Sequence, residues 1–331
     1  MVRPSPISAT VPYDEDGVHH GFLRVPYSRN DSAWGSLMIP ICVVRNGDGP
    51  TALLTGANHG DEYEGPIALQ HLAQSIDMSN VKGRVMIVPA LNYPAFRAGT
   101  RTSPIDKGNM NRIFPGRPDG SITEKIADYI QRVIVAMSDI VVDIHAGGKS
   151  LDFVPFAMAH VLPDKDQQAK CVAAMRAFNA PYSATFVEID NVGMLDTAVE
   201  EQGKVFVSTE LGGGGTATAR SIAIARKGIR NVLVHSGIVD GEPVIEPSID
   251  IDVPDDDCFV VSEHDGLIEF AVDLGSSVQK TDLVARVWPI DRTGQAPVDY
   301  HARRGGILVG RHFPGLVKAG DCMAVVGVIR E

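Results

Sequence analysis

The sequence has little of several features that mark large classes of protein. Only 6% of its 331 residues are aromatic, which argues against a surface that stacks the bases of single-stranded nucleic acid. Asp and Glu outnumber Lys and Arg by 41 to 30, and the resulting net charge of −11 disfavours general binding to nucleic acid or to an anionic membrane. No apolar run reaches about 18 residues, and the N-terminus lacks the apolar core of a signal peptide. We therefore expect a cytoplasmic protein with neither nucleic acid nor a membrane among its partners.

Cysteine is also scarce. The four cysteines, Cys42, Cys171, Cys258 and Cys322, lie far apart and form no CxxC pair. This spacing argues against a zinc knuckle or a disulfide framework and predicts buried free thiols instead. None of the four has a neighbourhood that indicates a nucleophile.

The rest of the composition is that of an ordinary globular protein, with 44% hydrophobic and 21% charged residues. Its length suggests one large domain plus a small one, or two domains. Acidic residues and prolines gather in residues 241–257, which we interpret as an acidic linker. Residues 258–331 contain short apolar runs between glycines, which are typical of a small all-β, barrel-like domain. Residues 1–240 then form the larger domain.

The larger domain has the pattern of an α/β fold. Residues 51–54 and 84–89 predict buried strands, and the apolar side chains of residues 66–76 between them have mostly helical spacing. A strand, a helix and a strand in this order predict a parallel pair with a right-handed crossover. Further strands are predicted at residues 140–144 and 204–210. We therefore expect a mixed, largely parallel sheet flanked by helices.

Two potential metal ligands follow the first of these strands. His59 and Glu62 lie in the turn between the strand and the next helix, where open α/β sheets keep their ligand sites. An imidazole and a carboxylate three residues apart can face one point, and Zn²⁺ accepts both. The alternative is a polar turn in which Glu62 and Glu64 favour the N-terminus of the helix.

A third potential ligand follows another strand. His145 comes directly after the strand at residues 140–144 and precedes two glycines. The carboxyl ends of parallel strands meet at one edge of a sheet, so we expect His145 on the same edge as His59 and Glu62. Asp143 lies two residues earlier and is a candidate to orient the imidazole from behind.

Glu210 ends a further predicted strand, just before Leu211 and the four glycines of residues 212–215. Beside a metal site, a carboxylate in this place is the expected general base. A glycine-rich loop can instead hold a phosphate at a helix N-terminus. The sequence contains no GxxxxGK[ST] and no GxGxxG after the first strand, which disfavours a nucleotide site.

A long segment, residues 91–119, shows little periodicity and holds several basic and amide side chains, among them Arg97, Arg101, Asn111 and Arg112. A loop of this length inside a compact domain is usually functional. Arginine presents a planar fork that suits a carboxylate, so an anionic group is the expected ligand. The alternative is a solvated surface loop.

Taken in order, His59-x-x-Glu62, the Asn111-Arg112 pair, His145 and Glu210 resemble the zinc-dependent succinylglutamate desuccinylase/aspartoacylase family. This family is a branch of the zinc carboxypeptidase-like fold, and the resemblance spans roughly residues 50–240. The small C-terminal β domain fits the family's second domain. The resemblance implies a catalytic α/β domain, a small-molecule N-acyl amino acid as substrate, and one Zn²⁺ per chain.

The resemblance also implies roles for single residues. His59, Glu62 and His145 hold Zn²⁺, and Glu210 is the catalytic base. Asn111 and Arg112 bind the carboxylate of the substrate. Arg101 is the expected cation for the oxyanion, with Arg97 as its rival.

Within the family, residues 106–116 and the glycine-rich segment after Glu210 are most similar to the N-α-acetyl-L-2,4-diaminobutyrate deacetylases of ectoine degradation. That substrate carries an ammonium group, for which Glu188, Asp190 and Asp196 are candidate partners. The alternatives are a deacylase of the N-succinylglutamate or N-acetylaspartate type, a metallocarboxypeptidase that acts on peptides, and a metal-binding protein without activity. The ligand set also admits Mn, Fe or Co, and the sequence is compatible with a homo-oligomer.

Overall fold

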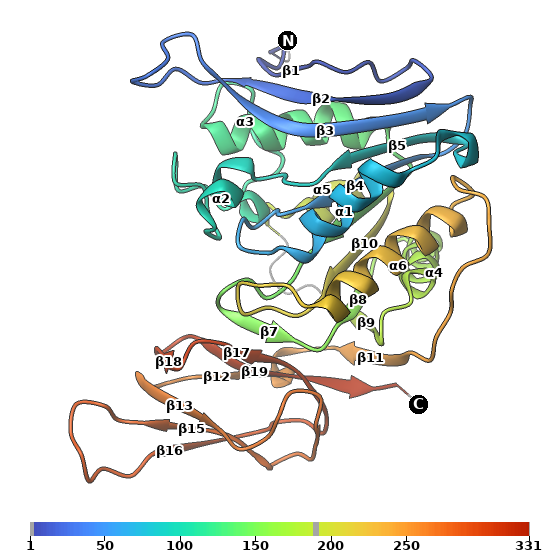
Figure 1. Cartoon of the computed structure of the whole chain (residues 1–331). Coiled ribbons are helices and arrows are strands. Elements are labelled where there is room, and N and C mark those ends of the chain that lie inside the picture. Colours follow the sequence, from blue (N-terminus) through green and yellow to red (C-terminus); the bar gives the residue numbers. More distant parts are fainter. Residues whose placement is uncertain (1–2, 188–191, 331) are drawn as a thin grey trace.

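The computed structural model describes residues 3–187 and 192–330. Figure 1 shows a large twisted sheet with helices on both sides of its central part, and a small separate sheet formed by the C-terminal residues. The predicted fold class is therefore confirmed: a mixed α/β sheet flanked by helices, with a small antiparallel sheet at the C-terminus.

The large sheet is parallel at its centre, where β5, β4, β6 and β10 run in one direction, and antiparallel towards β2 and β3. In spatial order its strands are β1 (Ser8–Ala9), β2 (Gly17–Pro26), β3 (Ser36–Asn46), β5 (Gly83–Val88), β4 (Thr51–Gly56), β6 (Ile140–Ile144), β10 (Val205–Glu210), β8 (Phe156–His160), β9 (Tyr182–Phe186), β11 (Ile249–Val253), β19 (Cys322–Ile329), β17 (Gly306–His312) and β14 (Ser277–Val278). Two short strands lie off this path, β12 (Phe259–Val261) beside β19 and β7 (Leu151–Phe153) beside β17.

Each face of the central sheet is covered by its own helices. Successive side chains of a strand point to opposite faces, so Leu54 of β4 lies in one apolar core and Leu53 lies in the other. The first core packs under α1 (Glu64–Ser75), α4 (Lys165–Phe178) and α6 (Ala219–His235), and the second packs under α3 (Ile122–Tyr129) and α5 (Leu195–Glu200). Figure 1 shows α1 and α6 side by side on the first face.

Helix α3 begins with a capping box. The Oγ of Ser121 accepts a hydrogen bond from the backbone N–H of Glu124, and the Glu124 carboxylate accepts one from the N–H of Ser121. This reciprocal capping box satisfies two backbone donors that a helix N-terminus otherwise leaves unpaired. The helix continues as a π-turn at Ile130–Ile134 and a 3₁₀ turn at Val135–Met137.

The C-terminal module, which the structure describes from residue 258 to residue 330, joins the large sheet and also forms the small one. The small sheet has the order β16 (Val298–His301), β15 (Leu283–Trp288), β13 (Gly266–Phe270) and β18 (Leu316–Val317). Strand β11 lies inside the segment that we expected to be a linker, and it pairs with β9 on one side and β19 on the other. Backbone hydrogen bonds therefore continue from the α/β part into the C-terminal module, and the domain boundaries stay a prediction.

Several short elements were not predicted, among them two short helices and a strand. Helix α2 (Tyr93–Ala98) and a 3₁₀ turn at Met110–Arg112 lie inside the segment with little periodicity, and β9 was not recognised as a strand. Helix α2 is only six residues long and ends at Gly99, whose φ of +60° suits glycine. A helix of that length shows no full apolar stripe, which explains why periodicity missed it.

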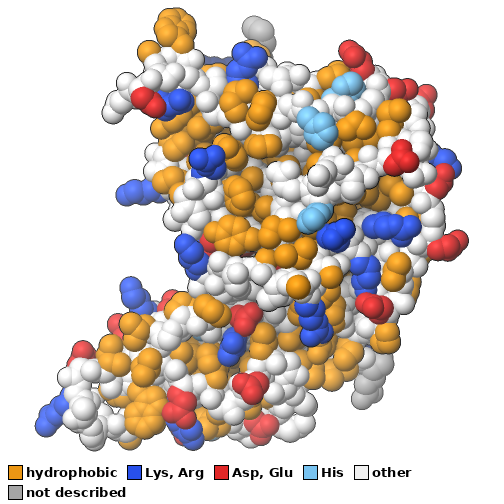
Figure 2. Space-filling view, in the orientation of Figure 1, with side chains coloured by type: hydrophobic (Ala, Val, Ile, Leu, Met, Phe, Trp, Pro, Cys, Tyr) orange, Lys and Arg blue, Asp and Glu red, His pale blue; other side chains and the backbone are white. Residues whose placement is uncertain are grey.

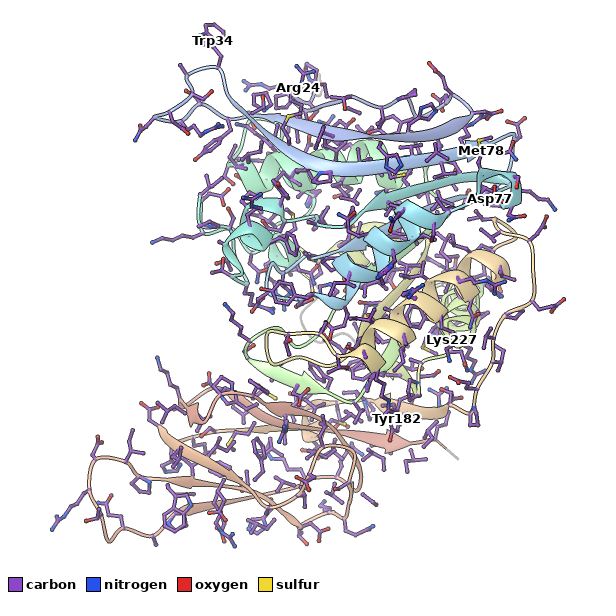
Figure 3. All side chains as sticks on the ribbon, in the orientation of Figure 1. Arg24, Trp34, Asp77, Met78, Tyr182 and Lys227 are labelled. Carbon is purple, nitrogen blue, oxygen red and sulfur yellow. The ribbon has the colours of Figure 1, made fainter. Side chains whose placement is uncertain are left out.

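The surface carries both signs of charge. On the face in view in Figure 2, Lys and Arg side chains are interspersed with Asp and Glu. Trp34 extends from the β2–β3 connection into solvent and is 99% exposed (Figure 3).

Cys42, Cys171 and Cys258 are buried and Cys322 is half-buried, all as free thiols, which confirms the prediction for three of the four and the absence of disulfides among them. In the described ranges, no helix combines the length and the apolar character needed to cross a bilayer.

Candidate active site and metal centre

Three neighbouring strands bring the predicted ligands together. Strands β4, β6 and β10 are parallel, so their carboxyl ends meet at one edge of the sheet. His59 and Glu62 follow β4, His145 follows β6, and Glu210 is the last residue of β10. His59, Glu62 and His145 are buried, with exposed fractions of 4%, 2% and 6%.

The turn that carries His59 and Glu62 is held tightly between the sheet and α2. Ala57 has a φ of +48°, which reverses the chain directly after β4. Gly60 lies so close to α2 that a Cβ atom on it would be 2.1 Å from the carbonyl carbon of Ala95. Glycine at this position therefore lets the turn approach the helix and brings His59 over the end of the sheet.

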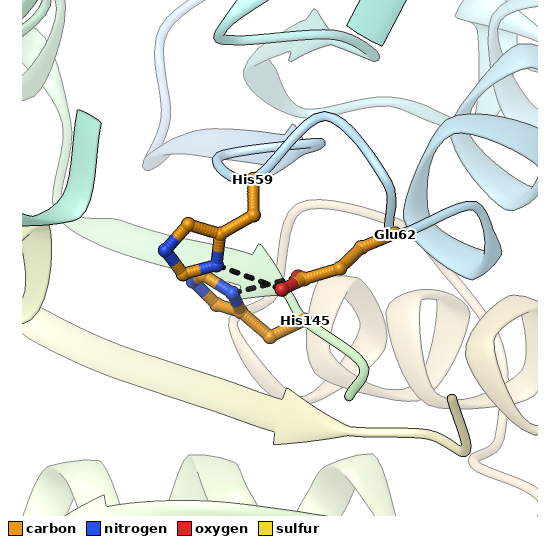
Figure 4. A group of neighbouring side chains, drawn as sticks. All are labelled: His59, Glu62 and His145. Atoms are coloured by element: carbon orange, nitrogen blue, oxygen red, sulfur yellow. Dashed lines mark hydrogen bonds and ion pairs between the residues drawn. The ribbon is translucent and has the colours of Figure 1, made fainter. Parts of the chain in front are cut away.

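The carboxylate of Glu62 lies between two imidazoles, as Figure 4 shows. Its Oε1 is 2.7 Å from Nδ1 of His59, and its Oε2 is 2.8 Å from Nδ1 of His145. The other ring nitrogen of His145, Nε2, is 2.8 Å from Oδ2 of Asp143. Asp143 therefore orients the imidazole from behind, as its position in the sequence suggested.

The electrostatics of this cluster favour a cation. Burial lowers the pKa of His59, which favours the neutral imidazole, the form that binds a metal. Burial also works against a charge on His145, but the carboxylates of Asp143 and Glu62 outweigh it and hold the pKa of His145 well above its usual range. Burial would raise the pKa of Glu62, yet the two imidazoles hold that pKa far below its usual range. Positive charge is thus stabilised between these groups.

The residues fit a divalent metal ion. Within the described part of the chain, His59, Glu62 and His145 offer ligand atoms that all lie within 4.8 Å of one another. Two imidazoles and one carboxylate are the ligand set of many catalytic zinc sites, which keep their fourth position for water or substrate. Because Asp143 binds Nε2 of His145, Nδ1 remains to face a metal; carboxylates that bond to the far nitrogen of a metal-binding histidine commonly orient it in this way.

The carboxylate of Glu210 stands beside this cluster. Its Oε2 is buried and has no hydrogen-bond partner among the residues that the structure describes. Burial, with added repulsion from Glu62, raises the pKa of Glu210 to about 8. A carboxyl group with a raised pKa can hold a proton near neutral pH, which is what a group that exchanges protons with a substrate requires.

The two candidate arginines lie in different places. Nη1 of Arg101 is 3.9 Å from Oε1 of Glu62, and its side chain is 45% exposed, so it reaches from solvent to the cluster. Arg97 instead lies over the ring of Tyr93 on α2, with its guanidinium carbon 6.0 Å from the ring centre. Of the two, the structure brings Arg101 to the cluster of His59, Glu62 and His145.

Asn111 and Arg112 lie in the 3₁₀ turn at Met110–Arg112. Asn111 is buried, and its Oδ1 accepts hydrogen bonds from Nδ2 of Asn58 at 3.2 Å and from the N–H of Leu195 at 2.9 Å. Nη1 of Arg112 donates to the backbone carbonyl of Asn111 at 2.7 Å. The sequence analysis did not single out Asn58, although it directly precedes His59.

Two further predictions concern the acidic partners of the substrate's ammonium group and the alternative of a phosphate site in the glycine loop. Glu188 and Asp190 lie outside the described residues. Asp196 is buried and its Oδ1 accepts hydrogen bonds from the N–H and hydroxyl of Thr197, so its position does not show a substrate contact. In the glycine loop, the N–H groups of Gly214 and Gly215 donate to the carbonyls of Leu151 and Gly148, which leaves neither for a phosphate.

The comparison of this chain with a family model and its comparison with curated proteins agree with each other. The family model of the succinylglutamate desuccinylase/aspartoacylase catalytic domain matches residues 48–236. The curated N-α-acetyl-L-2,4-diaminobutyric acid deacetylase of Halomonas elongata is 56% identical over 331 residues, which cover 99% of this chain and 97% of the relative.

Solved structures extend the similarity to the whole fold. A product-bound structure of the ectoine utilization protein EutE (DoeB) from Ruegeria pomeroyi is 66% identical, with a TM-score of 0.97 over 98% of this chain and all of that one. A succinylglutamate desuccinylase from Silicibacter sp. TM1040 is also 66% identical, with a TM-score of 0.97 over 99% of this chain and 100% of that one. A succinylglutamate desuccinylase/aspartoacylase from Rhodobacter sphaeroides is 38% identical, with a TM-score of 0.94 over 99% and 100% of the two chains.

Proposed function

Because the chain belongs to the succinylglutamate desuccinylase/aspartoacylase family, we propose that it is an amidohydrolase that converts N-α-acetyl-L-2,4-diaminobutyrate and water into L-2,4-diaminobutyrate and acetate. The observation that carries this proposal is the buried group of His59, Glu62 and His145 in a chain that is 56% identical, over almost its entire length, to a deacetylase of that substrate. The identity includes the C-terminal module and not only the α/β part.

We infer one Zn²⁺ per chain, which the side chains of His59, Glu62 and His145 would hold. The donor set supports zinc, since two histidines and a glutamate with one open position are a common catalytic zinc site. A bound Zn²⁺ would act there as a Lewis acid towards the acyl carbonyl and would lower the pKa of a water molecule.

Glu210 is the proposed base and acid of the reaction. Its Oε2 takes a proton from the attacking water, so that the oxygen can add to the amide carbonyl carbon. The same oxygen then delivers the proton to the amide nitrogen as the C–N bond breaks, which releases acetate and the amine. The buried, unpartnered Oε2 and the raised pKa of Glu210 support this role.

Two cations are proposed to bind the rest of the substrate. The guanidinium of Arg101 stabilises the negative charge that develops on the carbonyl oxygen, since it is the arginine near Glu62. Arg112 binds the α-carboxylate through its planar fork, with the amide of Asn111 beside it. The partner of the substrate's ammonium group stays open.

The test is the release of acetate from a panel of N-acetyl amino acids by the zinc-loaded protein. The panel contains N-α-acetyl-L-2,4-diaminobutyrate, its N-γ isomer and N-acetylaspartate, with N-succinylglutamate read as succinate. A strong preference for the N-α-acetyl compound supports the proposal. A preference for an acidic substrate keeps the mechanism and rejects the substrate, whereas efficient cleavage of longer peptides would favour a carboxypeptidase.

A further inference from the structure

A buried chain of hydrogen bonds joins the metal ligands to the proposed carboxylate-binding turn. It starts at His145, whose Nε2 bonds to Oδ2 of Asp143 at 2.8 Å. The same oxygen accepts a hydrogen bond from Nδ2 of Asn58 at 2.8 Å, and Nδ2 of Asn58 also donates to Oδ1 of Asn111 at 3.2 Å. Oδ1 of Asn111 in turn accepts from the N–H of Leu195.

Asn58 links the two ends of this series of hydrogen bonds, which are His145 with Asp143 on one side and the carboxylate-binding turn on the other. A carboxamide nitrogen carries two N–H donors, and Asn58 directs one to Asp143 and one to Asn111. Asn58 is fully buried, with an exposed fraction of 0%. Its Oδ1 is also buried and has no hydrogen-bond partner among the described residues, an arrangement that costs stability. A residue selected only for packing would be apolar, so the two N–H donors are the reason for asparagine here.

The contacts of Asn111 fix which end of its amide faces outward. The N–H of Leu195 and the N–H of Asn58 are donors, so the atom between them must be the acceptor Oδ1. Nδ2 of Asn111 therefore points away from both. No hydrogen bond of that nitrogen is found within residues 3–187 and 192–330, and Asn111 retains 8% exposure. The amide thus offers a donor to a ligand, which suits a carboxylate and not an ammonium group.

Arg112 is hydrogen-bonded to the residue beside it in the same turn, Asn111. Its Nη1 donates to the backbone carbonyl of Asn111. A Cβ atom on Gly193 would lie 2.5 Å from the carbonyl carbon of Arg112, and the N–H of Phe114 donates to the carbonyl of Gly193 at 3.0 Å. Movement of Asn111 would therefore shift the backbone from which Arg112 reaches the substrate.

From these contacts, we propose that Asn58 is a positioning residue that couples the metal ligand His145 to the carboxylate-binding pair Asn111 and Arg112. Through Asp143 it holds the imidazole of His145 towards the metal, and through Oδ1 of Asn111 it sets that amide to donate. The substrate half of this proposal rests on the proposed function, whereas the metal half stands on the hydrogen bonds alone.

The test compares Asn58→Ala with Thr55→Val as a matched control. Thr55 is also buried, and its hydroxyl donates to the other oxygen of Asp143 at 2.7 Å, but among the described residues it makes no hydrogen bond to Asn111. Two quantities are measured for each variant: the dissociation constant of Zn²⁺ by competition with a chromophoric chelator, and KM and kcat at saturating zinc with the best substrate of the panel.

Both variants should bind Zn²⁺ about 10- to 100-fold more weakly, the usual effect of removing a group that orients a metal ligand. At saturating zinc, Asn58→Ala alone should also raise KM, by about tenfold or more, while Thr55→Val keeps the KM of the wild type. An unchanged zinc affinity in Asn58→Ala, or a KM equal to that of Thr55→Val, overturns the coupling.

A further variant covers the case in which Asn58→Ala does not fold. Asn111→Asp keeps an oxygen for Asn58 and Leu195 but replaces the outward N–H donors with a second oxygen. It should raise KM by at least tenfold with little change in zinc affinity, and a KM within twofold of the wild type overturns the assigned orientation. If the wild type hydrolyses nothing in the panel, the proposed function fails, and the zinc affinities of Thr55→Val and Asn58→Ala still decide the metal half.

Discussion

Nδ1 of His145 lies 2.8 Å from Oε2 of Glu62, although 83 residues separate the two along the chain. The register of the sheet creates this contact. Strands β4 and β6 are parallel neighbours in which Gly56 pairs with Ile144, so the residues that follow the two strands emerge at the same level. A buried carboxylate that faces two imidazoles is the arrangement from which the metal-binding predictions follow.

Replacing Glu62 with Gln should remove most of the metal affinity. The amide is neutral and keeps only one acceptor oxygen, so the site loses the charge that balances a divalent cation. The loss should exceed the roughly 10- to 100-fold effect of removing an outer partner. Metal content after dialysis checks this, with Glu269→Gln on the exposed strand β13 as control. Wild-type stoichiometry in Glu62→Gln would exclude this glutamate as a ligand.

Replacing Glu210 with Gln should separate metal binding from turnover. Glutamine has a similar shape but cannot carry a proton to the leaving amine, so kcat should fall by about 10²- to 10⁴-fold. The zinc content should stay near that of the wild type, because Glu210 makes no hydrogen bond to the three ligands. Near-normal turnover of Glu210→Gln would show that another group moves the proton.

Arg101→Met and Arg97→Met form a matched pair that tests the oxyanion assignment. Arg101 approaches Glu62, whereas Arg97 lies over the ring of Tyr93. Arg101→Met should lower kcat by about 10²- to 10³-fold, the usual effect of losing one oxyanion donor, and Arg97→Met should change it little. The reverse result in steady-state kinetics would transfer the role to Arg97.

The sequence was sufficient for the parts of the site that the sheet itself determines. His59, Glu62, His145 and Glu210 each follow or end an apolar strand, and parallel strands place such residues at one edge without knowledge of their side-chain contacts. The order of strands could not be derived in this way, because β11 crosses from the α/β part to the C-terminal module through backbone pairing that its acidic, proline-bearing sequence does not indicate.

The orientation of individual amide and guanidinium groups could not be predicted from the sequence. Asn111 was predicted as a substrate contact, but the structure shows that its oxygen is already used by Asn58 and Leu195. Arg97 remained a rival of Arg101 until the structure placed Arg97 over Tyr93 and Arg101 near Glu62. Such differences depend on short elements and on contacts between residues far apart in sequence, which periodicity does not encode.

Asp106 should make stability depend on pH in the acid range. Burial opposes its charge, but hydrogen bonds from Thr123 and Gly108 hold the pKa of Asp106 below its usual value. A carboxylate with a lowered folded-state pKa stabilises the protein above the unfolded-state pKa of about 4, and this contribution is lost as pH falls through the folded-state value.

Asp106→Asn should therefore be less stable than the wild type at pH 7, by about 1 kcal/mol as for the loss of a helix-capping bond, with a smaller difference at acid pH. Urea midpoints of both proteins between pH 7 and pH 3 measure this. Asp119→Asn, which breaks only an exposed ion pair with Arg3, should show little change at any pH. A difference between Asp106→Asn and the wild type that is constant with pH would contradict the assignment.

Gly60 should be the residue of the metal-binding turn that least tolerates a side chain. A Cβ atom there would meet the backbone of Ala95 at 2.1 Å, and backbone cannot move aside by changing a rotamer. Gly60→Ala should therefore displace the turn from α2, separate His59 from Glu62 and His145, and lower both zinc affinity and thermal stability. Gly315→Ala is the control, because its Cβ would meet only the Leu267 side chain at 3.7 Å. If Gly60→Ala bound zinc as the wild type does, the ligand geometry would not depend on the close approach of the turn to the helix.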